Sequence, residues 1–132
     1  MIEYFDAPDV KKRLEEIVQL LLFDHVCIDS LYCIRSRGSR AMRTIARIHG
    51  LNRIWQKAMG IEPMYIIEVI SERFDRLDET EQDKTLIHEL LHIPKGFKGG
   101  FRSHKRYVNK GTVETWYIRL QNRRRESRPD KS

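Results

Sequence analysis

The pattern His88-Glu89-Leu90-Leu91-His92 carries the clearest chemistry in this sequence. Two histidines four positions apart on a helix project from one face, about 6 Å apart, and can hold one metal ion from the same side. Glu89 follows the first histidine, so its carboxylate can reach a water on that metal without filling a coordination position. The spacing therefore predicts a zinc site with His88 and His92 as ligands and Glu89 as a general base.

A catalytic zinc needs a third protein ligand and one open position for water. Two candidates follow the motif: His104, beyond a glycine-containing loop, and Glu114, at the start of a predicted helix that would supply a carboxylate as in gluzincins. The metzincin spacing is excluded because Lys95 and Lys98 occupy its glycine and histidine positions. We favour His104 and keep Glu114 as the alternative.

The motif helix and the segments after it resemble the small phage-type zinc metallopeptidases, which are similar to the SprT-like zinc proteases. The resemblance rests on His88-Glu89-Leu90-Leu91-His92, Gly99-Gly100-Phe101-Arg102 and His104-Lys105-Arg106-Tyr107. In the SprT-like pattern a third histidine is followed three residues later by an aromatic residue, which His104 and Tyr107 match. Lys105 departs from the glycine that commonly follows that histidine, and no four-cysteine zinc ribbon follows. The resemblance implies a zincin-like fold and a zinc metallopeptidase.

Such an enzyme would hydrolyse a peptide bond with a zinc-activated water, and Glu89 would carry the proton from that water to the departing amine. The oxyanion needs a further donor, for which Tyr107, Arg102 and Tyr117 are candidates, and we select Tyr107. In zincin folds the substrate lies along an exposed sheet edge, so one of the strands predicted near 26–48 or 64–70 would receive it.

Hydrophobic periodicity predicts the elements that must position these residues. Helices are predicted at 6–22, 53–59, 79–93 and 112–125, and strands at 26–36, 41–49 and 64–70. Asp78 and Glu81 form a capping-box pattern for the motif helix, and Pro94 ends it. The first two strands are expected to form a β-hairpin around Gly38, although 41–49 alone is also compatible with a helix.

The chain of 132 residues suits one domain. We predict a single-domain α+β fold in which a small antiparallel or mixed sheet packs against the motif helix. The metallopeptidase-like domain is expected over residues 1–125, with a polar, disordered tail at 126–132. Trp55 is expected to anchor the core, and Cys27 and Cys33 are expected to be buried thiols that form no disulfide with each other.

The net charge of +6 is unevenly distributed. Residues 95–132 hold 12 Lys and Arg against 3 Asp and Glu, whereas residues 1–94 hold 13 against 16. This basic stretch could contact nucleic acid phosphates or select acidic substrates. The alternative to an enzyme is therefore a non-catalytic, zinc-stabilised module that binds nucleic acid or protein through the basic C-terminal region. The acidic start and the lack of a long apolar segment predict a cytoplasmic protein without membrane contact.

Overall fold

The sheet of this protein has four strands in the order β1-β2-β4-β3. The strands are β1 (Glu3–Asp6), β2 (Leu31–Arg37), β3 (Ala46–Gly50) and β4 (Tyr65–Ile70). β2 and β4 run parallel in the centre, and the edge strands β1 and β3 are each antiparallel to their neighbour. The computed structural model describes residues 1–94, 101–102 and 107–127. The predicted α+β fold with a small mixed sheet is confirmed.

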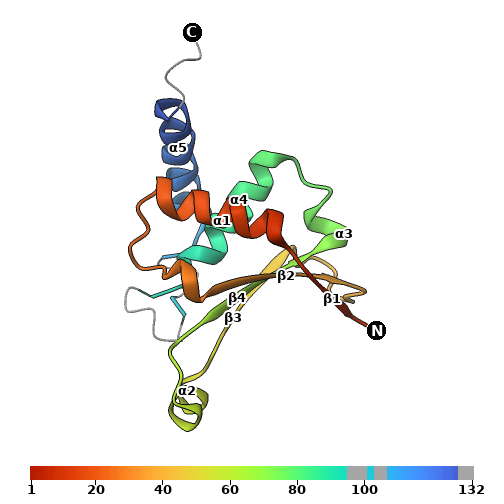
Figure 1. Cartoon of the computed structure of the whole chain (residues 1–132). Helices are drawn as coiled ribbons and strands as arrows, with labels where there is room; N and C mark the ends of the chain where they lie inside the picture. The colour runs from red at the N-terminus through yellow and green to blue at the C-terminus, as the bar shows by residue number, and fades with distance from the viewer. Residues whose placement is uncertain (95–100, 103–106, 128–132) are drawn as a thin grey trace.

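Three long helices supply the other half of the core: α1 (Pro8–Leu20), α4 (Glu79–Leu91) and α5 (Lys110–Glu126). In Figure 1, α1 and α4 lie over one face of the sheet, and α5 stands at the far side of α4. Each helix buries residues spaced three or four apart, namely Val10, Leu14 and Ile17, then Leu86, Ile87 and Leu90, then Val113, Tyr117 and Leu120. Alternate residues of β4 meet them, because Tyr65, Ile67 and Val69 are fully buried in the same cluster.

The predicted helices and the predicted strand 64–70 are confirmed within a few residues. The predicted helix 53–59 is α2 (Arg53–Met59), and the predicted helix 112–125 is α5. A short helix, α3 (Ser71–Phe74), follows β4 directly. The strand expected at 41–49 exists as β3, so its alternative as a helix is wrong.

The predicted hairpin is wrong, because β4 lies between β2 and β3. Five of the six β4 residues are buried. A strand this apolar is most stable in the centre of the sheet, where β2 and β3 cover both of its edges. Gly38 does turn the chain, with a φ of +87°, but the turn packs against the N-terminus: a Cβ at Gly38 would lie 2.7 Å from the Met1 carbonyl oxygen. The chain then crosses to the far edge before β3 begins.

Two expectations about burial are also wrong. Cys27 is exposed, because it precedes a short 3₁₀ helix (Ile28–Ser30) and β2 begins only at Leu31. Cys33 is half-buried in β2, where burial raises the pKa of its thiol to about 12. Neither cysteine forms a disulfide, as expected.

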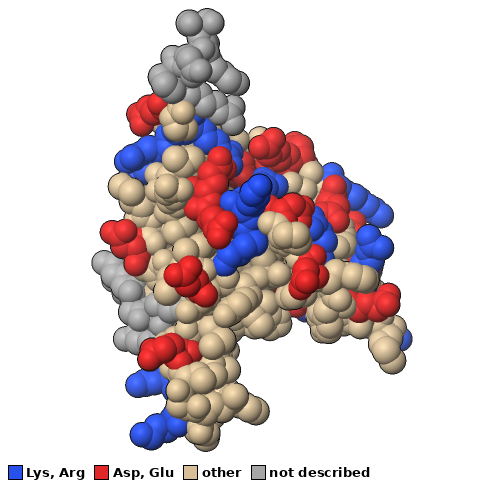
Figure 2. Space-filling view, in the orientation of Figure 1, with Lys and Arg blue, Asp and Glu red and all other residues tan. Residues whose placement is uncertain are grey.

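Trp55 is not a core anchor, since 55% of it is exposed. It lies on α2, which connects β3 to β4. This helix projects from the end of the sheet, on the side opposite to α1, α4 and α5 (Figure 1). Capping interactions at both ends stabilise this helix. The Asn52 side chain accepts a hydrogen bond from the Trp55 N–H, and Gly60 ends the helix at a φ of +63°. In Figure 2 the projection is mostly uncharged, with basic side chains at its tip.

Among the described residues, no helix combines the length and the apolar character that a membrane crossing requires.

Candidate active site

Helix α4 presents the His-Glu-x-x-His motif in its last turn. The Asp78 side chain caps its start by accepting a hydrogen bond of 2.9 Å from the Glu81 N–H, as the sequence predicts. The helix ends at Leu91, so His92 occupies the C-cap position and keeps a right-handed helical conformation. The motif is therefore held by a capped, buried helix up to its second histidine.

The two motif histidines lie side by side. The ring centroids of His88 and His92 are 5.1 Å apart, and the ring planes are inclined at 73°. His92 is buried, whereas about a third of the His88 side chain is exposed. This arrangement matches the predicted pair of ligands on one helix face.

Backbone contacts with Arg102 fix the orientation of His92. The Nδ1 atom of His92 lies 3.0 Å from the Arg102 carbonyl oxygen, and the Arg102 N–H donates a 2.7 Å hydrogen bond to the His92 carbonyl oxygen. Because a carbonyl oxygen only accepts, Nδ1 carries a proton, and in the neutral ring the lone pair is then at Nε2. A zinc-binding histidine has this arrangement, with its second nitrogen donating to a carbonyl group.

Glu89 is buried beside these rings, with 7% of its surface exposed. Its Oε2 atom is 4.0 Å from His88 Nε2. Burial raises the pKa of Glu89 to about 8. Among the described residues, no lysine or arginine forms an ion pair with it.

Two hollows meet at the motif. One, of about 710 Å³, extends from His88 and Glu89 towards the start of α5. The other, of about 530 Å³, extends towards His92, Phe101 and Arg102. Ala46 lines both hollows, so the edge strand β3 forms their shared wall.

Within the described part of the chain, no third histidine, cysteine or carboxylate joins the histidine pair in a metal-binding group. The favoured ligand His104 lies outside the described residues. Glu114 lines the larger hollow with His88, but its Oε2 atom is 2.9 Å from Lys84 Nζ. The histidine pair, the oriented His92 and the buried Glu89 nevertheless fit a zinc ion, with one ligand still to be identified.

The three candidate oxyanion donors differ in position, and in the described part of the chain only one of the three lines a hollow together with the motif histidines. Arg102 lines the smaller hollow with Glu89, and its guanidinium lies 4.1 Å from the centroid of the Tyr107 ring. Tyr107 lines a separate hollow next to His25 and Trp116, which Arg102 also lines. The Tyr117 hydroxyl donates a 3.1 Å hydrogen bond to Thr80. Arg102 is therefore the candidate that directly borders the motif.

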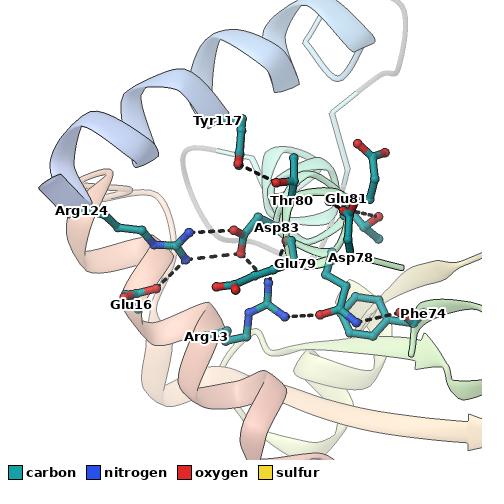
Figure 3. Close-up of polar contacts among 12 residues, drawn as sticks. Arg13, Glu16, Phe74, Asp78, Glu79, Thr80, Glu81, Asp83, Tyr117 and Arg124 are labelled. Atoms are coloured by element: carbon teal, nitrogen blue, oxygen red, sulfur yellow. Dashed lines mark hydrogen bonds and ion pairs between the residues drawn. The ribbon is translucent and has the colours of Figure 1, made fainter. Parts of the chain in front are cut away.

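A buried ion cluster behind α4 was not found by sequence reasoning (Figure 3). Asp83, which is 1% exposed, accepts hydrogen bonds from Arg13 of α1 at 2.6 Å and from Arg124 of α5 at 2.7 Å. Arg124 also binds Glu16 of α1 at 2.7 Å. The cluster ties three helices together, and in Figure 3 both arginines point at the Asp83 carboxylate. One signal was available: Asp83 precedes Leu86, Ile87 and Leu90 by three, four and seven positions, which places it on the buried stripe.

A second buried carboxylate fixes the edge strand. Glu68 of β4 is 3% exposed and lies in register with Arg47 of β3. It accepts hydrogen bonds from Ser36 at 2.6 Å and Arg47 at 2.9 Å, and its Oε1 atom is 2.8 Å from His49 Nε2. Burial raises the pKa of Glu68, but these hydrogen bonds outweigh it and lower the pKa to about 2.

The basic C-terminal stretch is only partly described. In the run Arg123-Arg124-Arg125, Arg124 is directed into the Asp83 cluster. Figure 2 shows basic side chains gathered near the end of α5 and mixed acidic and basic side chains elsewhere on this face. Contact of the remaining basic residues with phosphate stays a prediction.

Comparison with known proteins gives one match. A family model described as putative phage metallopeptidase matches residues 2–122. Searches of the curated proteins and of the solved structures find no match.

Proposed function

This chain belongs to the putative phage metallopeptidase family, and we propose that it is a zinc-dependent peptidase that uses Glu89 as its general base. The family description supports a metal-dependent hydrolase of peptide bonds, for which the substrate class is a protein or peptide. We further propose that residues 1–125 form the catalytic domain and that residues 126–132 form a tail outside it.

One observation carries the proposal: Glu89 is buried beside the two histidines, at the point where two hollows meet. A carboxyl group that is buried without a cationic partner destabilises the fold, because the charged form loses its hydration. Such a cost is typical of residues retained for chemistry. Its raised pKa also suits a group that must accept and then release a proton near neutral pH.

His88 and His92 would hold the zinc ion, and His104 is the proposed third ligand. Glu114 is the weaker candidate, because its carboxylate is already engaged by Lys84. When bound, zinc supplies Lewis acidity and makes a water nucleophilic at neutral pH.

The residues of this chain then perform the proton transfers. Glu89 accepts a proton from the attacking water and delivers it to the nitrogen of the leaving amine. The hydrogen bond from His92 Nδ1 to the Arg102 carbonyl oxygen orients the ring, and Nε2 is the atom that would bind the metal ion. Arg102 is the proposed source of positive charge for the oxyanion, and Tyr107, whose ring centroid lies 4.1 Å from the Arg102 guanidinium, remains the predicted hydrogen-bond donor.

The edge strand β3 is the proposed docking strand for the substrate. Among the strands that the structure describes, β3 pairs only with β4, and its residues Ala46 and Ile48 line the hollows that contain Glu89. An extended peptide that adds to this edge would pass directly over the motif. β1 is the other edge of the sheet and is separated from β3 by two strands.

The substitution Glu89→Gln tests the proposal. We expect cleavage of an unfolded protein such as casein to fall by roughly 10²–10⁴-fold, while zinc content measured by elemental analysis is retained. Glu79→Gln, an exposed change at the start of the same helix, is the matched control and should cleave normally. Equal activity of the Glu89→Gln variant would rule out the assigned base.

The third ligand is tested in the same assays. His104→Ala should lower zinc content and activity together, whereas Glu114→Ala should keep the metal. The opposite result would assign the ligand to Glu114.

A further inference from the structure

The larger hollow beside Glu89 has cationic side chains on three sides. Arg43 precedes β3, Lys84 lies on α4 one turn before His88, and Lys110 is the first residue of α5. The same hollow is also lined by three carboxyl groups: Glu81, Glu114 and the proposed base Glu89. The balance between these charges determines which substrate side chains it accepts.

Glu81 and Glu114 are both directed to one ammonium group, that of Lys84. Lys84 Nζ is 2.9 Å from Glu114 Oε2 and 3.8 Å from Glu81 Oε2. The ion pair with Glu114 raises the pKa of Lys84 above its usual value. Among the described residues, Arg43 and Lys110 are left with no carboxylate partner. Arg43 adjoins β3 and Lys110 begins α5, so the hollow holds two cations from different elements that remain available to an added carboxylate.

The direction of β3 relates this charge to a particular part of the substrate. The end of β3 near Ala46 borders the cationic hollow, whereas Ile48 borders the hollow near His92. A peptide that pairs antiparallel to β3 runs from Gly50 towards Ala46. Its residues before the scissile bond then lie near Ile48, and those after the bond lie between Arg43 and Lys110.

We propose that this cationic hollow binds a carboxylate group of the substrate on the C-terminal side of the scissile bond. The inference rests on the proposed peptidase function and names the substrate class that the site prefers. The carboxylate can belong to an Asp or Glu side chain or to the C-terminus of the peptide. Lys84 contributes less than the other two cations, because it is already paired.

Peptides of one parent sequence test this preference in the zinc-loaded full-length protein. The set has a neutral parent, versions with one Glu after the scissile bond, and versions with one Glu before it. Each of these peptides is made twice, once with a free and once with an amidated C-terminus. Mass spectrometry gives the cleaved bond, and kcat/KM gives the rate. We expect a Glu after the bond to raise kcat/KM roughly fivefold for each cation that it contacts, and a Glu before the bond to have no such effect.

The peptide ends distinguish the two sources of the carboxylate. If the side chain is recognised, the gain survives amidation of the C-terminus. If the terminal carboxylate is recognised, the free neutral peptide is preferred to its amidated form, and the gain is restricted to bonds close to the end. Equal rates throughout the set, or a gain from Glu before the bond, would overturn the proposal while leaving the peptidase function intact.

Charge reversal assigns the effect to residues. In Arg43→Glu and Lys110→Glu, the ratio of acidic to neutral peptide cleavage should fall to one or below. Lys110→Glu places an acid in the first turn of α5, where it is favourable for the helix, so folding should be preserved. Arg40→Glu and Lys57→Glu are matched controls at exposed positions that do not line the cationic hollow. These variants should keep the wild-type ratio of acidic to neutral peptide cleavage.

Binding gives a readout that does not depend on catalysis. In the Glu89→Gln variant, fluorescence anisotropy should show that a labelled acidic peptide binds more tightly than the neutral one, and that 0.5 M salt removes the difference. If the wild-type protein cleaves no peptide, the proposed function fails, and this measurement still decides the inference. Equal affinities for the two peptides would refute the cationic site itself.

Discussion

Helix α4 carries two buried carboxyl groups, six residues apart, in contrasting surroundings. Asp83 is 1% exposed and is bound by two arginines, one from α1 and one from α5. Glu89 is 7% exposed and forms no ion pair with a lysine or arginine of the described chain. Within the described ranges, the fold therefore neutralises one acid of this helix and places no lysine or arginine on the other.

Glu68 belongs with Asp83 in this comparison. Its carboxylate receives hydrogen bonds from two strands, and its pKa is lowered to about 2, whereas burial raises the pKa of Glu89 to about 8. A carboxylate that holds elements together is matched by cations and donors, and one available for proton transfer is not. The same chemical change, from carboxylate to amide, should therefore have opposite effects on stability at these sites.

Asp83→Asn should give the largest change. The amide cannot neutralise Arg13 and Arg124, which would remain packed between three helices (Figure 3). Removing one partner of a buried ion cluster typically costs about 3–5 kcal/mol, and because both arginines are partly exposed we expect the lower end, about 3 kcal/mol. Urea denaturation followed by circular dichroism measures this change.

Glu79 offers a comparison, since it is an exposed acid at the start of α4. Glu79→Gln should change stability by less than about 0.5 kcal/mol. If Asp83→Asn were equally harmless, the ion cluster would contribute nothing to the fold, and the contrast with Glu89 would lose its basis.

Glu68 gives the next largest effect, through pH. Its pKa is about 2 in the folded protein and near 4.5 when unfolded. A group with a depressed folded pKa contributes stability that is complete above pH 4.5 and is lost as the pH falls towards 2. The difference between the folded and unfolded pKa of Glu68 corresponds to at most about 3 kcal/mol in the free energy of unfolding.

The measurement is the free energy of unfolding of the wild type and of Glu68→Gln between pH 2 and pH 6. The wild type should lose stability more steeply than the variant between pH 4.5 and pH 2. Parallel curves would show that Glu68 has an ordinary pKa and is not held by its partners.

The contrast between these acids also shows what the sequence could predict. The motif histidines, Glu89 and the Asp78 cap were found because their chemistry depends on spacing within one helix. Asp83 and Arg124 are 41 positions apart, and Glu68 meets Arg47 only through the register of two strands. Such partners depend on packing between elements, which local periodicity does not reveal.

The same reason explains the errors in the fold. Residues 26–36 and 41–49 have strand patterns separated by a turn, and nothing local indicates that a later strand inserts between them. Trp55 has apolar neighbours in sequence, yet its helix projects from the sheet. Element types followed from the pattern, whereas strand order and burial depended on distant segments.

Glu89→Gln should have a smaller effect on stability and the opposite sign. Metal-free protein should be unchanged or stabilised by up to about 1 kcal/mol, because the amide has a similar shape and never carries a charge that burial penalises. Differential scanning fluorimetry of chelator-treated protein measures this as a small rise in melting temperature. A loss comparable to that of Asp83→Asn would mean that Glu89 has a structural partner, and the two acids of α4 would then be alike.

His49→Gln should give the smallest change and shows how many partners Glu68 needs. About half of the His49 side chain is exposed, although its Nε2 atom is 2.8 Å from Glu68 Oε1. Solvent weakens such a contact, and Arg47 and Ser36 still bind the carboxylate, so we expect a loss of about 0.5 kcal/mol. Urea denaturation at pH 7, with Arg47→Gln measured beside it, should show the larger loss for Arg47. A greater loss for His49→Gln would show that the histidine, and not Arg47, is the main partner of Glu68, and the parallel with Asp83 and its two arginines would then fail.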